Sequence, residues 1–433
     1  MSCTPEPRIP RPRALGALLA LQLALPACSV PASDAEASER SAATRIYSID
    51  YRVTPDPGAR GAKVVMTVKQ DDDYLRELDM PLRGGEISDL GGDGDVSLAD
   101  DRIVWNPPAA GGSLRWFATI DHRRSSESYD AYIEDDWALF RAEDIIPSAL
   151  TRTLQGAESR TRLSFDLPAE WSSVTPYFGR NDSYEIDNPE RRFDTPTGWI
   201  VLGRIGVRNE RIDNVRLKVA GPTGHSIRRM DMLALMRWTL PELRRILPEF
   251  PERLTFVSAG APMWRGALSA PQSVYVHADR PLISENGTST MLHETVHVAL
   301  GLTAARGADW IVEGFAEYYS LEMLHRSGTI STERYRTAHA GLASWGRETR
   351  ELCTLHSSGS NMARAVSLLA DLNGEISKAS RGKANLDDVL FELGSYDSRI
   401  SVEQFREIVE RVAGKPVSTL NAKNLPGCKG EPE

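Results

Sequence analysis

The sequence predicts an α+β fold. An N-terminal all-β domain of sandwich type is expected over residues 46–221, and a mostly helical domain with a small sheet over residues 222–425. Short runs of β-branched and aromatic residues, separated by Gly- and Asp-rich turns, fill the first part, whereas apolar residues recur at helical spacing in the second. The chain has 433 residues, more than one hydrophobic core ordinarily holds, so two domains are expected.

The N-terminal segment predicts export. Arginines precede a 14-residue apolar run at 14–27, which is followed by Cys28. The run is too short to cross a bilayer, but it has the charge, length and small-residue end of a signal peptide. The sequence LPAC at 25–28 resembles a bacterial lipobox, so residues 1–28 are expected to be a signal peptide, with lipidation at Cys28. The alternative is an ordinary signal peptide cut near Ala27 or Ala32.

The predicted location is therefore the cell envelope or periplasm, with a lipid anchor in the membrane. Ser29, directly after the cysteine, favours the outer membrane. Residues 29–45 are small and polar, as in a flexible tether, and residues 426–433 form a short tail.

The composition argues against a nucleic-acid partner. The net charge is −9 and no basic run occurs, so no nucleic-acid partner is expected.

Cys353 and Cys428 lack metal-site spacing. An oxidising compartment would permit a disulfide between them, and two free thiols are the alternative.

The first domain is expected to consist of short strands, with one helical or irregular piece at 137–146. Turn clusters such as DPG at 56–58 and GGDGD at 91–95 separate the strands. The strands are expected at 46–53, 63–68, 113–120, 162–167 and 215–219.

The second domain is expected to be helical around a small sheet. Residues 230–247 have helical spacing, and Pro241 is expected to open a second short helix there. Strands are expected at 254–258 and 273–277. Further helices are expected at 289–301, 309–326, 331–347, 359–373, 385–393 and 401–413.

One of these helices carries the pattern HExxH, with His293, Glu294 and His297. Residues four apart lie on one helical face, so both imidazoles can reach one ion. Glu294 then lies beside the metal, where it can take a proton from an attacking water. Apolar flanking residues predict a buried helix, and this setting favours Zn²⁺.

The next helix offers a third ligand. Glu313 follows His297 by 16 positions, which leaves room for a loop and an antiparallel return. Glu317 lies one turn further on the same face, where it can accept the free N–H of a ligand histidine. We therefore expect one Zn²⁺ per chain, held by His293, His297 and Glu313.

HExxH followed by W-x-x-E-G-x-x-x-Y-Y at 310–319 resembles the gluzincin clan of zinc metallopeptidases. Within the clan, the sequence is most similar to the bacterial glycyl-aminopeptidase-type family, which places a β domain before a thermolysin-like catalytic domain. The stretches 137–147, 165–171 and 313–331 also resemble that family, and the similarity spans roughly residues 46–420. The resemblance implies a thermolysin-like zincin domain with Glu313 as the third zinc ligand.

Two positions depart from the family. Related enzymes often use a tyrosine as oxyanion donor, and His356 stands at the matching position. Tyr318, Tyr335 and Tyr396 are alternative donors. The segment 264–271 lacks the acid with which clan aminopeptidases bind a free amine, although it remains a candidate edge strand for an extended peptide.

The leading interpretation is a zinc peptidase that acts on a peptide or protein, with Glu294 as general base and His356 as oxyanion donor. The alternative is a catalytically weak zinc-binding envelope protein that binds peptides or protein partners. A β-domain adhesion module with an incidental HExxH is a third interpretation, which the paired helix at 310–319 disfavours.

Overall fold

The computed structural model describes residues 45–82, 86–188, 193–396 and 398–428. Cys28 and the predicted leader and tether, up to residue 44, lie outside these residues. Within the described ranges, no helix is both long and apolar enough to cross a membrane.

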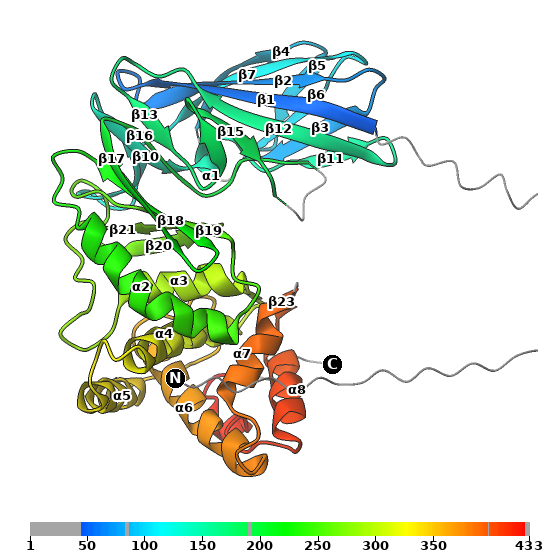
Figure 1. Cartoon of the computed structure of the whole chain (residues 1–433). Coiled ribbons are helices and arrows are strands. Elements are labelled where there is room, and N and C mark those ends of the chain that lie inside the picture. The colour runs from blue at the N-terminus through cyan, green and yellow to red at the C-terminus, as the bar shows by residue number, and fades with distance from the viewer. Residues whose placement is uncertain (1–44, 83–85, 189–192, 397, 429–433) are drawn as a thin grey trace, which may run out of the picture. The chain divides into compact units, whose positions relative to one another are not determined.

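The first domain contains three sheets (Figure 1). In β1 the side chains of Tyr47, Ile49, Tyr51 and Val53 are buried while the intervening residues are not, because alternate residues of a strand point to opposite faces. The seven-stranded sheet has the order β14 (Phe178–Arg180), β15 (Ser183–Ile186), β12 (Ala157–Phe165), β1 (Arg45–Asp56), β2 (Gly61–Lys69), β7 (Gly111–Thr119) and β4 (Ile87–Gly92).

Two smaller sheets complete this domain, as the sandwich prediction expects. The four-stranded sheet has the order β11 (Leu150–Thr153), β3 (Leu75–Pro81), β6 (Arg102–Asn106) and β5 (Asp95–Ala99). The five-stranded sheet has the order β13 (Ser172–Val174), β16 (Trp199–Gly203), β10 (Trp137–Arg141), β9 (Tyr129–Ile133) and β8 (His122–Arg123).

The helical or irregular piece expected at 137–146 is mostly a strand. Residues Trp137–Arg141 form β10, and only Ala142–Ile145 form a helix, α1. Successive side chains of β10 enter two different apolar clusters, so Trp137 to Phe140 are all buried. A strand that is buried on both faces shows no alternation, and periodicity therefore does not identify it.

A second, five-stranded sheet supports the helical domain. Its order is β17 (Ile205–Ile212), β18 (Val215–Pro222), β19 (Arg253–Val257), β21 (Ser273–Val276) and β20 (Ala267–Ala270). The predicted boundary at residue 221 falls after β17 and at the end of β18. The structure places these two strands in the second sheet, because β18 pairs in parallel with β19.

Helix α2 (Arg229–Ile246) is continuous, so the prediction that Pro241 opens a separate helix is wrong. Buried Leu233, Met236, Leu240 and Leu243 keep helical spacing across the proline. Packing of this face against the core offsets the missing hydrogen bond.

The remaining helices lie near their predicted positions. Helix α3 (Thr290–Leu300) begins where the Ser289 side chain accepts a hydrogen bond from the Leu292 N–H, and ends at Gly301, which has a φ of 57°. Such positive φ values favour glycine at helix ends. The others are α4 (Asp309–Arg326), α5 (Thr332–Gly346), α6 (Ser360–Ala379), α7 (Leu386–Gly394), α8 (Val402–Ala413) and the short η1 (Ala422–Asn424).

Two connections tie the helical domain together. The two-residue strands β22 (Thr303–Ala304) and β23 (Arg399–Ile400) pair in parallel. A disulfide joins Cys353 and Cys428, whose Cα atoms are 4.9 Å apart. Of the two alternatives left open for these cysteines, the structure has the disulfide.

Candidate metal centre

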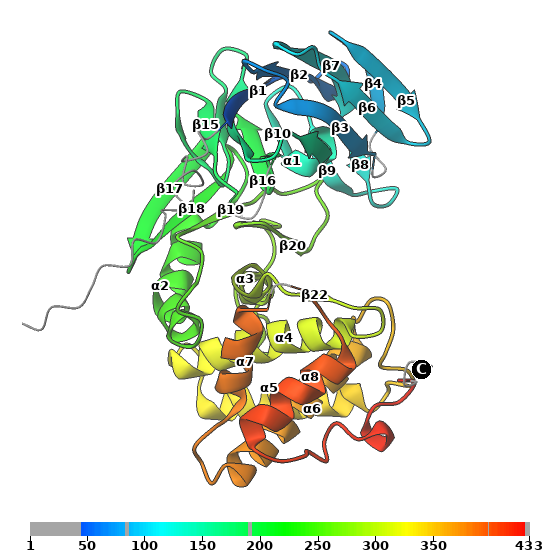
Figure 2. The ribbon, with the colours of Figure 1, turned by 90° about the vertical axis from the view of Figure 1, so that its right-hand side faces the viewer.

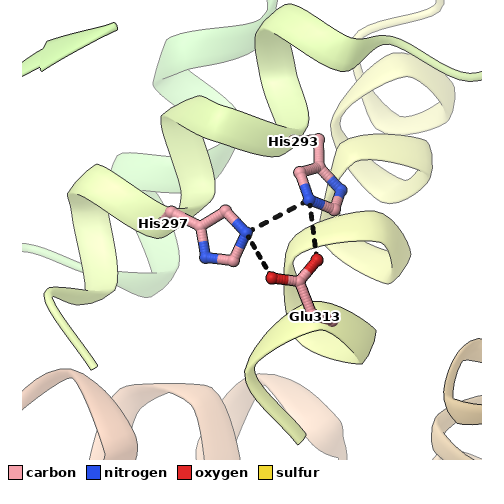
Figure 3. A group of neighbouring side chains, drawn as sticks. All are labelled: His293, His297 and Glu313. Carbon is pink, nitrogen blue, oxygen red and sulfur yellow. Dashed lines mark hydrogen bonds and ion pairs between the residues drawn. The ribbon is translucent and has the colours of Figure 1, made fainter. Parts of the chain in front are cut away.

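Helix α3 presents two histidines on one face. His293 and His297 lie one turn apart, and their Nε2 atoms are 3.1 Å from each other (Figure 3). The buried residues Met291, Leu292 and Val296 fix the helix against the core. The HExxH pattern therefore places both imidazoles on the same side of a buried helix.

Glu313 approaches both histidines from the neighbouring helix, α4. Its Oε2 lies 3.3 Å from the Nε2 of His293 and its Oε1 lies 3.4 Å from the Nε2 of His297 (Figure 3). Zinc–ligand bonds of about 2.0–2.1 Å in a tetrahedral site separate the ligand atoms by about 3.3 Å. Each histidine thus faces a different oxygen of the same carboxylate, and one ligand atom from each of the three side chains lies within 4.8 Å of the other two, close enough for all three to hold one zinc ion.

Among the residues that the structure describes, this is the one set of three His, Cys, Asp or Glu side chains placed to hold a metal ion. Two imidazoles and a carboxylate leave the fourth corner open. Three protein ligands with an open position are typical of catalytic zinc sites, whereas structural sites are closed by four.

Glu317 orients the first histidine. Its Oε2 accepts a hydrogen bond of 2.9 Å from the Nδ1 of His293, and the residue is only 6% exposed. Donation from Nδ1 leaves the Nε2 lone pair of His293 free for a metal. This is the contact expected of Glu317 from its position in the sequence.

The electrostatics of the site favour a bound cation. Burial lowers the pKa of His293, but hydrogen bonds to Glu313 and Glu317 outweigh it and raise the pKa to about 10. Burial raises the pKa of Glu313, but hydrogen bonds from His293 and His297 outweigh it and lower the pKa to about 2. The largely buried carboxylates of Glu313 and Glu317 are therefore stabilised by nearby positive charge, which either a proton on His293 or a metal ion can supply.

Glu294 links the metal helix to the edge of the second sheet. Its Oε2 accepts a hydrogen bond of 2.8 Å from the backbone N–H of Ser269 in β20. Strand β20 lies at the end of the sheet and against α3 (Figure 2). This hydrogen bond thus holds the carboxylate at a strand with one unpaired side.

Two cavities adjoin these residues. One of about 630 Å³ is lined by His297, by Ser269 to Pro271 of the edge strand and its turn, and by the loop after α3. The other, of about 480 Å³, is lined by Glu317, Trp345 and Met362 among others. Both volumes are in the range of ligand-binding cavities, about 300 to 1,000 Å³.

The predicted oxyanion donor lies on the loop between α5 and α6. His356 is exposed, and the next residue, Ser357, donates its N–H to Oδ2 of Asp309 over 2.5 Å. Asp309 opens the helix that carries Glu313, and burial raises its pKa, although the hydrogen bond from Ser357 acts in the opposite direction. This contact places the His356 loop beside the start of α4.

The alternative tyrosine donors have other surroundings. The hydroxyl of Tyr335 donates to Glu322, and the ring of Tyr318 is buried against Tyr319 and His339. Tyr396 follows the end of α7.

Sequence reasoning missed Asp309. It lies four residues before Glu313, one helical turn away, and anchors the loop of His356. The same spacing that singles out Glu317 on the other side of Glu313 would also have drawn attention to Asp309.

Comparison with known proteins gives structural neighbours only. No family model matches the sequence, and no curated protein matches it. An aminopeptidase N family protein from Idiomarina loihiensis has a TM-score of 0.57 and 16% identity, over 80% of this chain and 70% of that one.

Two further solved structures are similar. An M1 zinc metallopeptidase from Deinococcus radiodurans, solved as a point mutant, has a TM-score of 0.57 and 17% identity, over 90% of this chain and 95% of that one. Aminopeptidase A from Legionella pneumophila, solved with aspartic acid, has a TM-score of 0.54 and 12% identity, over 86% of this chain and 49% of that one. The β-rich N-terminal domain followed by a helical domain is thus a known architecture, and the chain has the fold of M1 zinc metallopeptidases.

Proposed function

We propose that this chain is a zinc-dependent peptidase that hydrolyses peptide bonds with an activated water. The observation that carries the proposal is the convergence of His293, His297 and Glu313, each of which offers one ligand atom within 4.8 Å of the other two. Bound there, zinc would polarise the scissile carbonyl and lower the pKa of the attacking water.

The chain's own residues supply the proton transfers. Glu294 is the general base: it takes a proton from the attacking water and delivers it to the leaving amine. Its contact with the Ser269 N–H fixes the carboxylate at the sheet edge. His356 is proposed as the donor to the oxyanion, and the hydrogen bond from Ser357 to Asp309 supports its loop near the site.

The proposed substrate is an extended peptide or protein segment. It would pair with β20, the edge strand next to α3, and a strand that adds to a sheet edge gains main-chain hydrogen bonds. Residues 264–271 contain no acid that could bind the free amine of a substrate. The proposal therefore favours neither cleavage at the end of a peptide nor cleavage at internal bonds. A relation to the glycyl-aminopeptidase type is supported by the order of a β domain followed by a helical domain.

We also propose that the chain works outside the cytoplasm, anchored through a lipid on Cys28. The disulfide between Cys353 and Cys428 supports this location, since such bonds persist in oxidising compartments. Mass spectrometry of the native N-terminal peptide tests it: a diacylglyceryl group on Cys28 is expected, and an unmodified N-terminus further along the chain would contradict it.

Metal analysis and turnover together test the peptidase proposal. Purified residues 29–433 should carry one zinc per chain, which Glu313→Ala should largely lose. Glu294→Gln should keep the zinc and reduce cleavage of a peptide library by about 10²- to 10⁴-fold. Absence of zinc after reconstitution, or full turnover in Glu294→Gln, would overturn the proposal.

A further inference from the structure

A third cavity, of about 450 Å³, lies where β17, β18 and β19 meet the segment 176–178 of the first domain. It is separate from the residues of the metal centre. Its volume is within the range of small-ligand sites, about 300 to 1,000 Å³.

The cavity is lined by an excess of cationic side chains. Of the four cationic residues, only Arg253 forms an ion pair, with Asp187. The other three have no carboxylate of a described residue within ion-pair distance. The four cationic residues are Arg211, Arg216, Lys218 and Arg253.

One acid, Glu210, also lines the cavity, but its charge is already matched. Arg237 of α2, which is outside the cavity lining, donates two hydrogen bonds to it. The surroundings of the cavity are therefore net positive, and the half-buried charge of Lys218 in particular favours an anionic partner.

Lys218 is half-buried and lines the cavity together with the three arginines. Its Nζ donates one hydrogen bond, of 3.2 Å, to the carbonyl oxygen of Thr175. An ammonium group has three N–H donors, so two remain for a ligand. Burial and, second, the nearby Arg253 lower the pKa of Lys218, and an anion next to it would relieve both effects.

The two arginines are held in place by an aromatic ring. The guanidinium carbons of Arg216 and Arg253 lie 4.6 and 4.7 Å from the ring centre of Phe178. The Arg253 side chain also hydrogen-bonds to Gln272 and Asp187, whereas the Arg216 guanidinium has no hydrogen-bond partner among the described residues. The contact with the ring restricts Arg216, and its N–H groups stay free for an oxyanion.

We propose that this cavity binds the oxyanion group, carboxylate or phosphate, of a small ligand. Lys218 and Arg216 donate to the oxyanion. Pro176, Phe178 and Leu217 supply an apolar wall for the body of the ligand.

The proposed anion site shares a wall with the cavity that reaches His297. Gln272, which accepts from Arg253, also lines that cavity. Tyr177, which lines the proposed anion site, hydrogen-bonds through its hydroxyl with Asn188 and Thr197. Both of these residues line the cavity that reaches His297. The two sites are thus neighbours with different ligand chemistry, and anion binding does not depend on the peptidase function.

Calorimetric titration of residues 29–433 with inorganic phosphate and with benzoate, at constant ionic strength, tests the proposal. Each titration is run on zinc-loaded and on chelator-treated protein, because an anion held by the metal would be lost on chelation. Saturable binding that survives chelation is expected. Phosphate alone would indicate a phosphorylated ligand, and benzoate alone a carboxylate.

The variants assign the binding to the cavity. Lys218→Met and Arg216→Gln should each weaken the Kd about tenfold or more, because each removes a charge-assisted hydrogen bond. Lys218→Arg should stay close to wild type. Arg208→Gln is the matched control, an exposed cation on β17 outside the cavity lining. The proposal is overturned if folded wild-type protein binds neither anion up to about 10 mM, or if Lys218→Met binds as wild type does.

Discussion

Replacement of Glu317 by alanine should weaken zinc binding without unfolding the chain. The side chain is 6% exposed, and its hydrogen bond of 2.9 Å is made to Nδ1 of the ligand His293. A hydrogen bond to a charged group contributes about 1.5–3 kcal/mol, which corresponds to a roughly 10- to 150-fold change in zinc Kd. This agrees with the roughly 10- to 100-fold losses typical when the partner of a metal-ligating histidine is removed.

Competition with a chromophoric zinc chelator measures the affinity, and circular dichroism confirms that each variant is folded. Glu317→Gln should lose less than alanine, because the amide oxygen can still accept from Nδ1. Glu322→Ala is the matched control: Glu322 lies on the same helix, is 8% exposed and pairs with Arg326 rather than with a ligand. The reasoning fails if folded Glu317→Ala binds zinc within twofold of wild type, or if the control weakens zinc equally.

Three further predictions concern stability. Replacing Cys353 and Cys428 by serine should lower the free energy of unfolding by about 2–4 kcal/mol, because the bond closes a long loop; urea titration of wild type and variant measures this, and equal midpoints would refute it. Buried His277 accepts a backbone N–H at Nδ1, and burial lowers its pKa below 6.5. The unfolded chain therefore binds the extra proton first, so stability should fall as the pH drops below about 6.5, and His277→Gln should flatten this part of a pH–Tm curve. Gly314→Ala would place a Cβ 2.7 Å from a methyl group of α6 and should cost about 1–3 kcal/mol, whereas Gly374→Ala, which meets nothing within 4 Å, should not destabilise; similar melting temperatures for the two variants would contradict the clash.

The metal centre was the most predictable part of the molecule. Two histidines four residues apart on a helix must share a face, and a glutamate on the next helix needs only a short loop to return to them. The spacing of His293, His297 and Glu313 therefore carries most of the geometry that the structure shows.

Other features depend on contacts that no local pattern encodes. β10 is buried on both faces, so its apolar run has no period. The sheet membership of β18 depends on its pairing with β19, in which Arg216 lies opposite Arg253, 37 residues later. Lys218 and Phe178 meet in one cavity only because strands from two domains pack together.

The placement of β20 has a consequence for solubility. A sheet edge that is open to a peptide is equally open to a second copy of the same protein, and such edges favour aggregation. β20 is four residues long and is followed at once by Pro271, which has no N–H to donate. The hydrogen bond from Ser269 to Glu294 occupies another donor of the strand. The edge is thus long enough for the proposed pairing with a short peptide beside Glu294, and too short and interrupted to extend into an intermolecular sheet.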